Sequence, residues 1–280
     1  MIDLHHRDDH DDMGGLHRDL RATGAAMDRR ALFRLAARFG VGVSALPLLG
    51  CGSSPTSPTS TSTSGTTTGT GSTCTSKIPE ETQGPYPGDG SNGPNVLSLS
   101  GVVRSDIRSS FAGLSGTAAG INLDIVLTIV SVSTCAPLAG YAVYIWHCDR
   151  GGLYSLYSAG ATNQNYLRGV QAADSNGRVS FTSIFPGCYA GRWPHIHFEV
   201  YPSLSAATSV ANKIATSQIA LPKATCDEVY ATSGYEASVT NLSRVSLATD
   251  GIFSDGASLE LATVSGSVSG GLTATLTVAV

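Results

Sequence analysis

Charged residues and tryptophan are both scarce in this chain. Of its 280 residues, 14% are charged and only 2 are Trp. The 17 basic side chains are outnumbered by 21 acidic ones, and the net charge of -4 argues against a nucleic-acid partner, whose binding depends on phosphate neutralisation. The apolar run at 39–49 is far short of the roughly 20 residues that a membrane-spanning helix needs. The 32 Gly residues instead favour a turn-rich β fold or one that carries a linker.

Residues 1–51 are interpreted as a leader with an export signal. Paired arginines, Arg29-Arg30, precede the apolar run, and Leu48-Leu49-Gly50-Cys51 resembles a bacterial lipobox, in which the Cys is acylated. The paired arginines suggest the Tat export route. An amphipathic basic helix at the start of a cytosolic protein is the alternative interpretation, and it leaves Cys51 unexplained.

Residues 52–76 are almost entirely Ser, Thr, Gly and Pro, a composition that predicts a disordered linker because it cannot bury apolar surface. With a lipid on Cys51, this linker would hold a folded domain off a membrane. We therefore expect an exported protein, anchored at the bacterial cell surface or on the outer side of a membrane. All three Met residues precede the signal, so the start is Met1 or Met27, and the His/Asp-rich stretch at 1–26 is interpreted as a disordered tail.

Residues 77–280 predict an all-β domain, a β-sandwich of mainly antiparallel strands. Apolar residues alternate with polar ones at 122–131, and the same alternation follows at 140–146, 178–185 and 195–201. The Gly/Ser/Thr-rich tail at 258–280 predicts a closing hairpin. No helical period exceeds about ten residues, which favours the sandwich.

Five cysteines follow Cys51, and an exported protein is expected to contain disulfides. The interpretation pairs Cys135 with Cys148 and Cys188 with Cys226, which leaves Cys74 near the linker. A zinc site is the competing interpretation, although no two of these cysteines have the short spacing that is usual for structural zinc.

Only three histidines remain after the leader, and two of them form the His195-x-His197 motif. Residues two apart on a strand share a face, so these imidazoles point together, either as half of a metal site or as a surface pair. Glu199 lies only two residues after His197, which is too close for a cupin-type site. His147 is expected to be a structural side chain.

Tyrosines complete a recognisable pattern. Tyr154 follows Trp146 by eight residues, Tyr189 follows Pro186 by three, and the His-x-His motif comes next. This order resembles the intradiol ring-cleavage dioxygenases, the family of protocatechuate 3,4-dioxygenase and catechol 1,2-dioxygenase. The resemblance runs from about residue 79 to 201. It implies a non-haem Fe(III) ion, and the implied ligands are Tyr154, Tyr189, His195 and His197.

The resemblance also implies the chemistry. A catechol-type aromatic diol would be cleaved by O2 between its two hydroxyl-bearing carbons to a cis,cis-muconate-type product, as in aromatic compound catabolism. Two phenolate ligands suit the ferric state. Tyr189 would leave the metal and act as a base, and Arg192 would stabilise negative charge on the substrate, its alternative role being a solvated surface charge. Tyr86 is expected either to wall the substrate pocket or to pack on the sandwich.

Two departures from the family pattern narrow the subfamily. No long helical N-terminal segment of the kind that catechol 1,2-dioxygenases use to dimerise is found, which disfavours that subfamily, and no second homologous chain is visible, so the two-subunit protocatechuate assembly is not assumed. The resemblance is strongest to the exported, single-chain bacterial branch. Trp146 is expected to be a core aromatic, and Tyr157 and Tyr166 do not fit the eight-residue spacing. A non-catalytic β-sandwich binding module of a surface lipoprotein is the alternative function. The ring substituents and the oligomeric state stay open at this stage.

Overall fold

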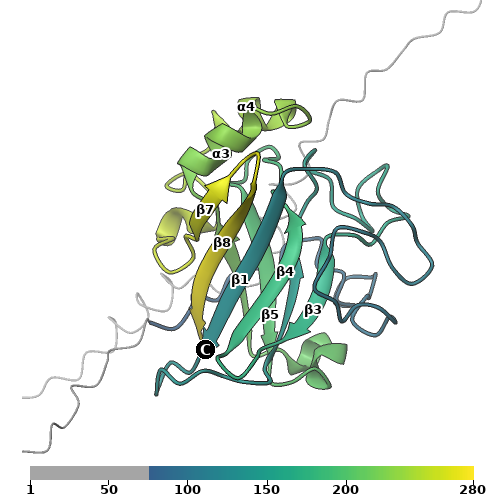
Figure 1. Cartoon of the computed structure of the whole chain (residues 1–280), viewed down its shortest axis with the longest axis vertical. Coiled ribbons are helices and arrows are strands. Elements are labelled where there is room, and N and C mark those ends of the chain that lie inside the picture. Colours follow the sequence, from purple (N-terminus) through teal and green to yellow (C-terminus); the bar gives the residue numbers. More distant parts are fainter. Residues whose placement is uncertain (1–75) are drawn as a thin grey trace, which may run out of the picture. The chain divides into compact units, whose positions relative to one another are not determined.

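The computed structural model describes residues 76–280, and two four-stranded sheets pack face to face in this part of the chain (Figure 1). The first sheet has the order β4-β1-β8-β7, formed by β4 (Arg178–Ile184), β1 (Asn122–Val130), β8 (Gly271–Ala279) and β7 (Thr263–Ser267). The second has the order β3-β2-β5-β6, formed by β3 (Arg168–Ala172), β2 (Ala142–Trp146), β5 (His195–Tyr201) and β6 (Ala215–Ala220).

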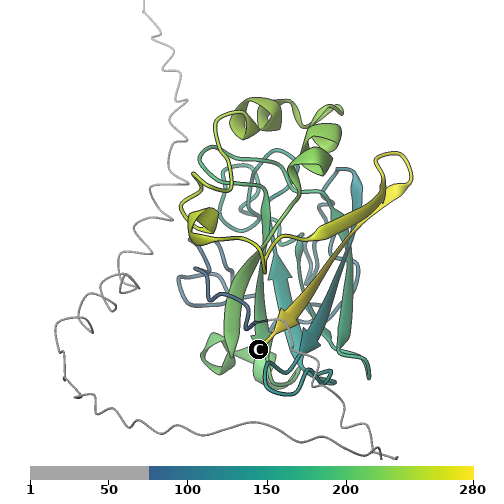
Figure 2. The same ribbon diagram turned by 90° about the vertical axis from the view of Figure 1, so that its left-hand side faces the viewer.

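The predicted all-β sandwich is confirmed. All strand pairs are antiparallel except β1 with β8, which run parallel. The expected closing hairpin is the one formed by β7 and β8, drawn in yellow in Figure 2. Two short helices, α3 (Lys223–Tyr230) and α4 (Glu236–Leu242), lie between β6 and β7 in the chain. Short 3-10 turns occur at Ala206–Thr208, Val210–Asn212 and Phe253–Asp255.

The main core lies between the two sheets. From β1 it receives Leu123, Ile125, Leu127 and Ile129, the face that the period-two alternation predicts, and all four are fully buried. From β5 it receives Ile196, Phe198 and Val200. The side chains that alternate with these on β5 therefore point to the outer face of the second sheet, because successive strand residues point to opposite sides.

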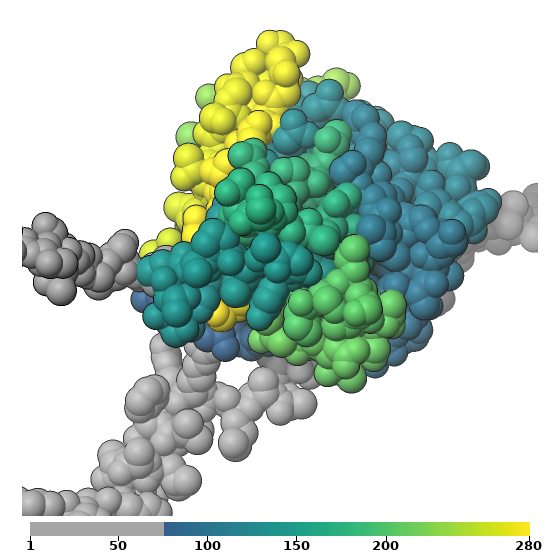
Figure 3. All heavy atoms as spheres, turned by 60° about the horizontal axis from the view of Figure 1, so that its bottom comes forward, coloured from purple at the N-terminus to yellow at the C-terminus, as the bar shows by residue number. Residues whose placement is uncertain are grey.

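A second apolar cluster covers that outer face. Residues of the segment before β1, among them Val96, Val102 and Phe111, pack against Tyr144 and Trp146 of β2. The segment between β5 and β6, green in Figure 3, also meets the N-terminal segment, where Lys213 donates to Gln83 at 3.0 Å. Every residue of β5 is consequently buried, on both faces of its sheet.

The predicted disulfides are wrong. Cys148, Cys188 and Cys226 are free, buried thiols, whereas Cys135 is disulfide-bonded to a partner that is not among these three. Cys135 lies in the segment between β1 and β2, and Cys148 follows the end of β2. A five-residue strand rises about 3.3 Å per residue, so it separates the two cysteines by more than the roughly 4.4–6.8 Å between Cα atoms that a disulfide spans.

The free thiols do not form a zinc site either. Within residues 76–280 no group of three or more His, Cys, Asp and Glu side chains could hold a metal ion. The same residues include no helix that is long and apolar enough to span a membrane. The leader at 1–51, the predicted 52–76 linker except its last residue, and Cys74 lie outside the described residues.

Glu260 introduces a carboxyl group into the interior. Its Oε1 atom accepts a hydrogen bond from Ser217 at 3.2 Å, while its buried Oε2 atom has no partner. Burial, assisted by the nearby charge of Glu81, raises the pKa of Glu260 to about 8. Because the folded protein holds this proton more tightly than the unfolded chain does, folding stability falls as the pH rises toward and through 8.

The substitution Glu260→Gln should remove this pH dependence. Between pH 6 and 9 the wild-type protein should lose about 1–3 kcal/mol of unfolding free energy through Glu260, since one unit of pKa is worth about 1.4 kcal/mol. Denaturant unfolding at both pH values measures the loss, with the exposed Glu228→Gln as the control. An equal loss in E260Q and wild type would contradict the assignment.

Candidate active site

The four predicted metal ligands meet at one place. The Nε2 atoms of His195 and His197 are 3.1 Å apart. The phenol oxygen of Tyr154 lies 3.4 Å from Nε2 of His195, and that of Tyr189 lies 3.2 Å from the same atom. Two oxygen donors and two nitrogen donors therefore surround a single point on the outer face of the second sheet.

The strand register fixes the orientation of the histidines. His197 lies between Trp146 on β2 and Gln218 on β6. The Trp146 ring stacks on the His197 imidazole with centroids 4.9 Å apart and planes 5° from parallel. Trp146 is fully buried, as expected of a core aromatic, and in this position it also restrains the His197 ring.

The two tyrosines come from loops that approach each other closely. Tyr154 lies in the segment between β2 and β3, where its backbone N–H donates to Ser158 Oγ at 2.9 Å. Tyr189 lies in the segment between β4 and β5. Gly152 has a φ of +86°, and a Cβ atom there would lie 3.0 Å from Cβ of Tyr189. Glycine at 152 thus permits both the backbone conformation and the close contact between the loops.

The protonation state of the two imidazoles leaves a nitrogen lone pair facing the point where the four side chains meet. Nδ1 of His195 lies 2.5 Å from the carbonyl oxygen of Trp193, a contact in which the ring N–H donates. Its Nε2 atom therefore carries a lone pair. Burial lowers the pKa of both His195 and His197 well below the ordinary value, with the charge of Arg192 acting in the same direction, so both rings are neutral at pH 7.

This donor set fits a metal ion. The lone pair of His195 Nε2 faces His197 and both phenol oxygens, and one lone pair cannot satisfy three hydrogen-bonding neighbours. A single cation would satisfy all four donor atoms at once. Imidazole nitrogen and phenol oxygen suit a transition metal. Tyrosines are needed for the site, because His, Cys, Asp and Glu alone form no such group within residues 76–280.

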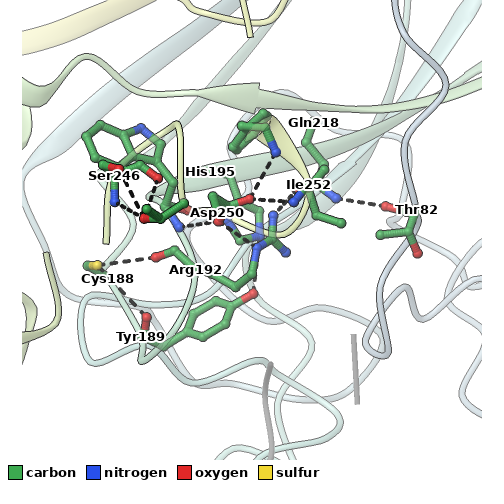
Figure 4. A network of polar contacts seen from close by, with 12 residues as sticks. Thr82, Cys188, Tyr189, Arg192, His195, Gln218, Ser246, Asp250 and Ile252 are labelled. Atoms are coloured by element: carbon green, nitrogen blue, oxygen red, sulfur yellow. Dashed lines mark hydrogen bonds and ion pairs between the residues drawn. The ribbon is translucent and has the colours of Figure 1, made fainter. Parts of the chain in front are cut away.

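Arg192 is buried beside these four side chains, so the alternative interpretation of Arg192 as a solvated surface charge is wrong. Its Nε atom donates to Asp250 Oδ2 at 2.9 Å, and its Nη2 atom donates to Gln218 Oε1 at 2.6 Å (Figure 4). The same Asp250 oxygen accepts from the Trp193 backbone N–H at 2.6 Å. The guanidinium is therefore held in one orientation by an ion pair and an amide.

Sequence reasoning missed both Asp250 and Gln218. Asp250 begins the turn before the 3-10 turn at Phe253–Asp255, and its Oδ1 atom accepts from the backbone N–H of Ile252 at 2.8 Å. An Asp-Gly pair is a turn signal, but nothing in the local sequence connects it to Arg192. Gln218 could have been found only from the register of β6 against β5.

The remaining predicted residues are placed as follows. Tyr86 is half-buried, and its ring centroid is 4.8 Å from that of Tyr154. His147 is a satisfied structural side chain, as predicted, with Nδ1 at 2.7 Å from the Cys148 carbonyl oxygen and Nε2 at 2.7 Å from Ser183 Oγ. The carboxylate of Glu199 accepts from Tyr201 at 2.6 Å and Lys213 at 3.2 Å instead of joining the four donors.

Comparisons with known proteins agree with this geometry. Residues 114–216 match a family model described as Dioxygenase. The fold is similar to that of an intradiol ring-cleavage dioxygenase from Tetranychus urticae, with a TM-score of 0.57 and 28% identity over 73% of this chain and 94% of the other. A second solved dioxygenase has a TM-score of 0.58 and 26% identity over 73% and 93% of the two chains. No curated protein sequence matches significantly.

In the matched family model and in its fold, the chain resembles the intradiol ring-cleavage dioxygenases. The match to the family model includes all four converging side chains and Arg192. It ends before Gln218 and Asp250, so the two residues that hold Arg192 lie outside the matched range.

Asp250→Asn tests the buried ion pair. Removing one partner of such a pair leaves the other charge uncompensated, which should lower the unfolding free energy by about 3–5 kcal/mol. Misplacement of Arg192 should also lower kcat/KM about tenfold or more in ring-cleavage assays run well below the melting temperature. The exposed Asp255→Asn is the matched control. Wild-type activity and stability in D250N would contradict the role of the pair.

Proposed function

We propose that the enzyme is a non-haem Fe(III) dioxygenase that cleaves a catechol-type diol between its two hydroxyl-bearing carbons, with O2, to a cis,cis-muconate-type product. One observation carries the proposal, the convergence of two phenol oxygens and two imidazole nitrogens on one buried point. Phenolates are hard, anionic donors that stabilise the ferric state over the ferrous state. The residues that would hold the ion are Tyr154, Tyr189, His195 and His197.

Bound there, a ferric ion would take up the diol through both of its oxygens and make the ring reactive toward O2. The four ligands differ in their freedom to move. Tyr154, His195 and His197 are each 2% exposed, whereas Tyr189 is only half-buried. Tyr189 is therefore the ligand suited to swing away when substrate enters, and its phenolate oxygen can then accept a proton from a substrate hydroxyl.

Arg192 is suited to stabilise negative charge on the substrate. It is a buried cation next to the histidines, and Asp250 and Gln218 hold its guanidinium from two sides. A charge that is already oriented in a water-poor site acts without reorganisation during the reaction. Tyr86, packed against Tyr154, provides an aromatic wall for the ring of the diol.

The alternative function, a non-catalytic binding module, gains no support from this arrangement. In such a module the tyrosines and histidines would be incidental and would have no reason to converge. The family match and the solved relatives favour the enzyme as well.

Iron loading and colour test the proposal. Protein produced in iron-replete medium should contain about one iron per chain, show a visible tyrosinate-to-iron charge-transfer band, and consume O2 with a catechol. Tyr154→Phe and His197→Ala should lose the band and lower kcat/KM by more than the roughly 10–100-fold that loss of an outer-shell partner costs. A screen of catechol, protocatechuate, hydroxyquinol and larger lignin-derived diols would identify the substrate.

Tyr166→Phe is the matched control for these ligand variants, because the Tyr166 hydroxyl donates to Asp149 at 3.3 Å and the residue is not one of the four ligands. It should keep colour and activity. Survival of both in Y154F and H197A, or a colourless, inactive wild-type protein with full iron, would overturn the proposed function.

We also propose that the enzyme belongs to an exported bacterial branch and is anchored through a lipid on Cys51. The sequence supports this through the lipobox-like Leu48–Cys51 and the Ser/Thr/Gly/Pro-rich stretch that follows it. In a bacterial host fed an alkyne-labelled fatty acid, the wild-type chain should be labelled and found with the membrane fraction. Cys51→Ala should be unlabelled and Ser53→Ala should behave as wild type, whereas label on C51A would exclude this anchor.

A further inference from the structure

Arg168 is a second buried cation near the site, and none of the roles described above uses it. It is the first residue of β3 and is 1% exposed. In the strand register it lies opposite Trp146, whose other neighbour is His197. One row across the sheet therefore runs from Arg168 through Trp146 and His197 to Gln218. Arg168 lies at one end of this row, and Gln218, which binds Arg192, lies at the other.

All five N–H groups of Arg168 are used, and none of them binds a carboxylate. Within residues 76–280 it takes part in no ion pair. Its acceptors are the carbonyl oxygens of Pro87 (2.7 Å), Tyr86 (2.9 Å) and Ser155 (2.9 Å), Ser155 Oγ (3.0 Å) and the Tyr144 hydroxyl (3.2 Å). A buried charge without a counter-ion is costly, so this geometry is unlike that of a core position chosen for stability alone.

These bonds join two segments that form the site. Ser155 directly follows the ligand Tyr154, and the carbonyls of Tyr86 and Pro87 belong to the segment whose Tyr86 ring packs on Tyr154. The approach at Gly88 is close, since a Cβ atom there would lie 2.8 Å from Nη1 of Arg168, and the φ of Gly88 is +64°. A side chain at position 88 would push the segment away from the guanidinium.

Tyr157 holds the same segment from another side. Its hydroxyl accepts from the Gly88 backbone N–H at 2.9 Å and donates to Asn92 Oδ1 at 2.8 Å. Its ring centroid is 5.3 Å from that of Tyr86, and the Arg168 guanidinium carbon lies 5.6 Å from the Tyr157 ring centroid. Arg168 thus holds the backbone of Tyr86 and Pro87, while the ring of Tyr86 packs against the rings of Tyr154 and Tyr157.

We propose that Arg168 is a positioning residue that joins the segment at 86–88 to the loop of Tyr154 and so holds Tyr86 as a rigid wall of the diol pocket. Arginine is required because its planar fork reaches both segments at once, whereas a lysine ammonium has three donors at a single point. Affinity for the diol depends on this wall being formed before binding, because ordering it during binding would cost affinity. The proposal rests on the proposed ring-cleavage function.

The variants Arg168→Lys and Arg168→Met test it. In iron-loaded protein, with rates normalised to iron content, we expect KM for the best diol to rise about tenfold while kcat changes less than about twofold. Val143→Ala, a truncation in the core between the sheets, controls for destabilisation and should leave KM unchanged. A wild-type KM in both Arg168 variants, or an equal rise in V143A, would overturn the proposal.

A double-mutant cycle identifies the route of the effect. If Arg168 acts through Tyr86, then R168K should raise KM less than about twofold in a Tyr86→Ala background, since the wall is already absent. Full additivity of the two substitutions would show that Arg168 does not act by positioning Tyr86.

Hydrogen exchange supplies a readout that needs neither iron nor substrate. The Gly88 amide should exchange about tenfold faster or more in R168K than in wild type, while amides of β1 keep their protection. Unchanged exchange at Gly88 would overturn the positioning role, whatever the activity. A wild-type protein that cleaves no diol would instead overturn the proposed function, so the two failures are distinguishable.

Discussion

The burial of β5 on both of its faces is the constraint on which the site depends. One face contributes Ile196, Phe198 and Val200 to the core between the sheets, and the other presents His195 and His197. The segment before β1 covers this second face with its own apolar cluster. Without that cover the imidazoles would be solvated, their pKa values would lie near the ordinary value, and water would compete for every donor at the centre.

Burying the charged groups of Arg192 and Arg168 under this segment costs free energy, and the structure offsets that cost in two ways. Arg192 is neutralised by the carboxylate of Asp250, whereas Arg168 is satisfied by five neutral acceptors. The first arrangement orients a charge beside the two histidines. The second joins two loops that carry aromatic walls. Arg168 thus lies at one end of the row across the second sheet and Arg192 near the other end, with the Trp146–His197 stack between them. Both arginines are buried, but their charges are stabilised in different ways.

The difference between the two histidines, which lie on a strand, and the two tyrosines, which lie on loops, follows from the same architecture. The two histidines are held by hydrogen bonds to neighbouring strands, so their positions are as rigid as the sheet. The two tyrosines lie on loops, and they differ in exposure because the N-terminal segment packs on Tyr154, while Tyr189 stays half-buried. Three of the four converging side chains are therefore buried, and the fourth, Tyr189, is more accessible.

The core face of β1 and the main side chains of the site were determined by local sequence. Period-two alternation placed Leu123, Ile125, Leu127 and Ile129 in the core, and it placed both histidines on one face, because a strand has only two faces and successive residues must alternate between them. The spacing of the tyrosines relative to Trp146 and the His-x-His motif indicated the four side chains that converge, through resemblance to a family. Such patterns are properties of a few consecutive residues and can be recognised without coordinates.

Only the tertiary structure decided which distant residues complete the site. Asp250 and Gln218 hold Arg192, and the carbonyls of Tyr86 and Pro87 hold Arg168, across separations of 26 to 82 residues. The disulfide pairing predicted from the sequence was also wrong, because strand β2 separates Cys135 from Cys148. The thiols of Cys148, Cys188 and Cys226 are all free. Backbone carbonyls carry no sequence signal, and the partner of a buried charge is set by strand register and loop packing, which depend on the whole chain.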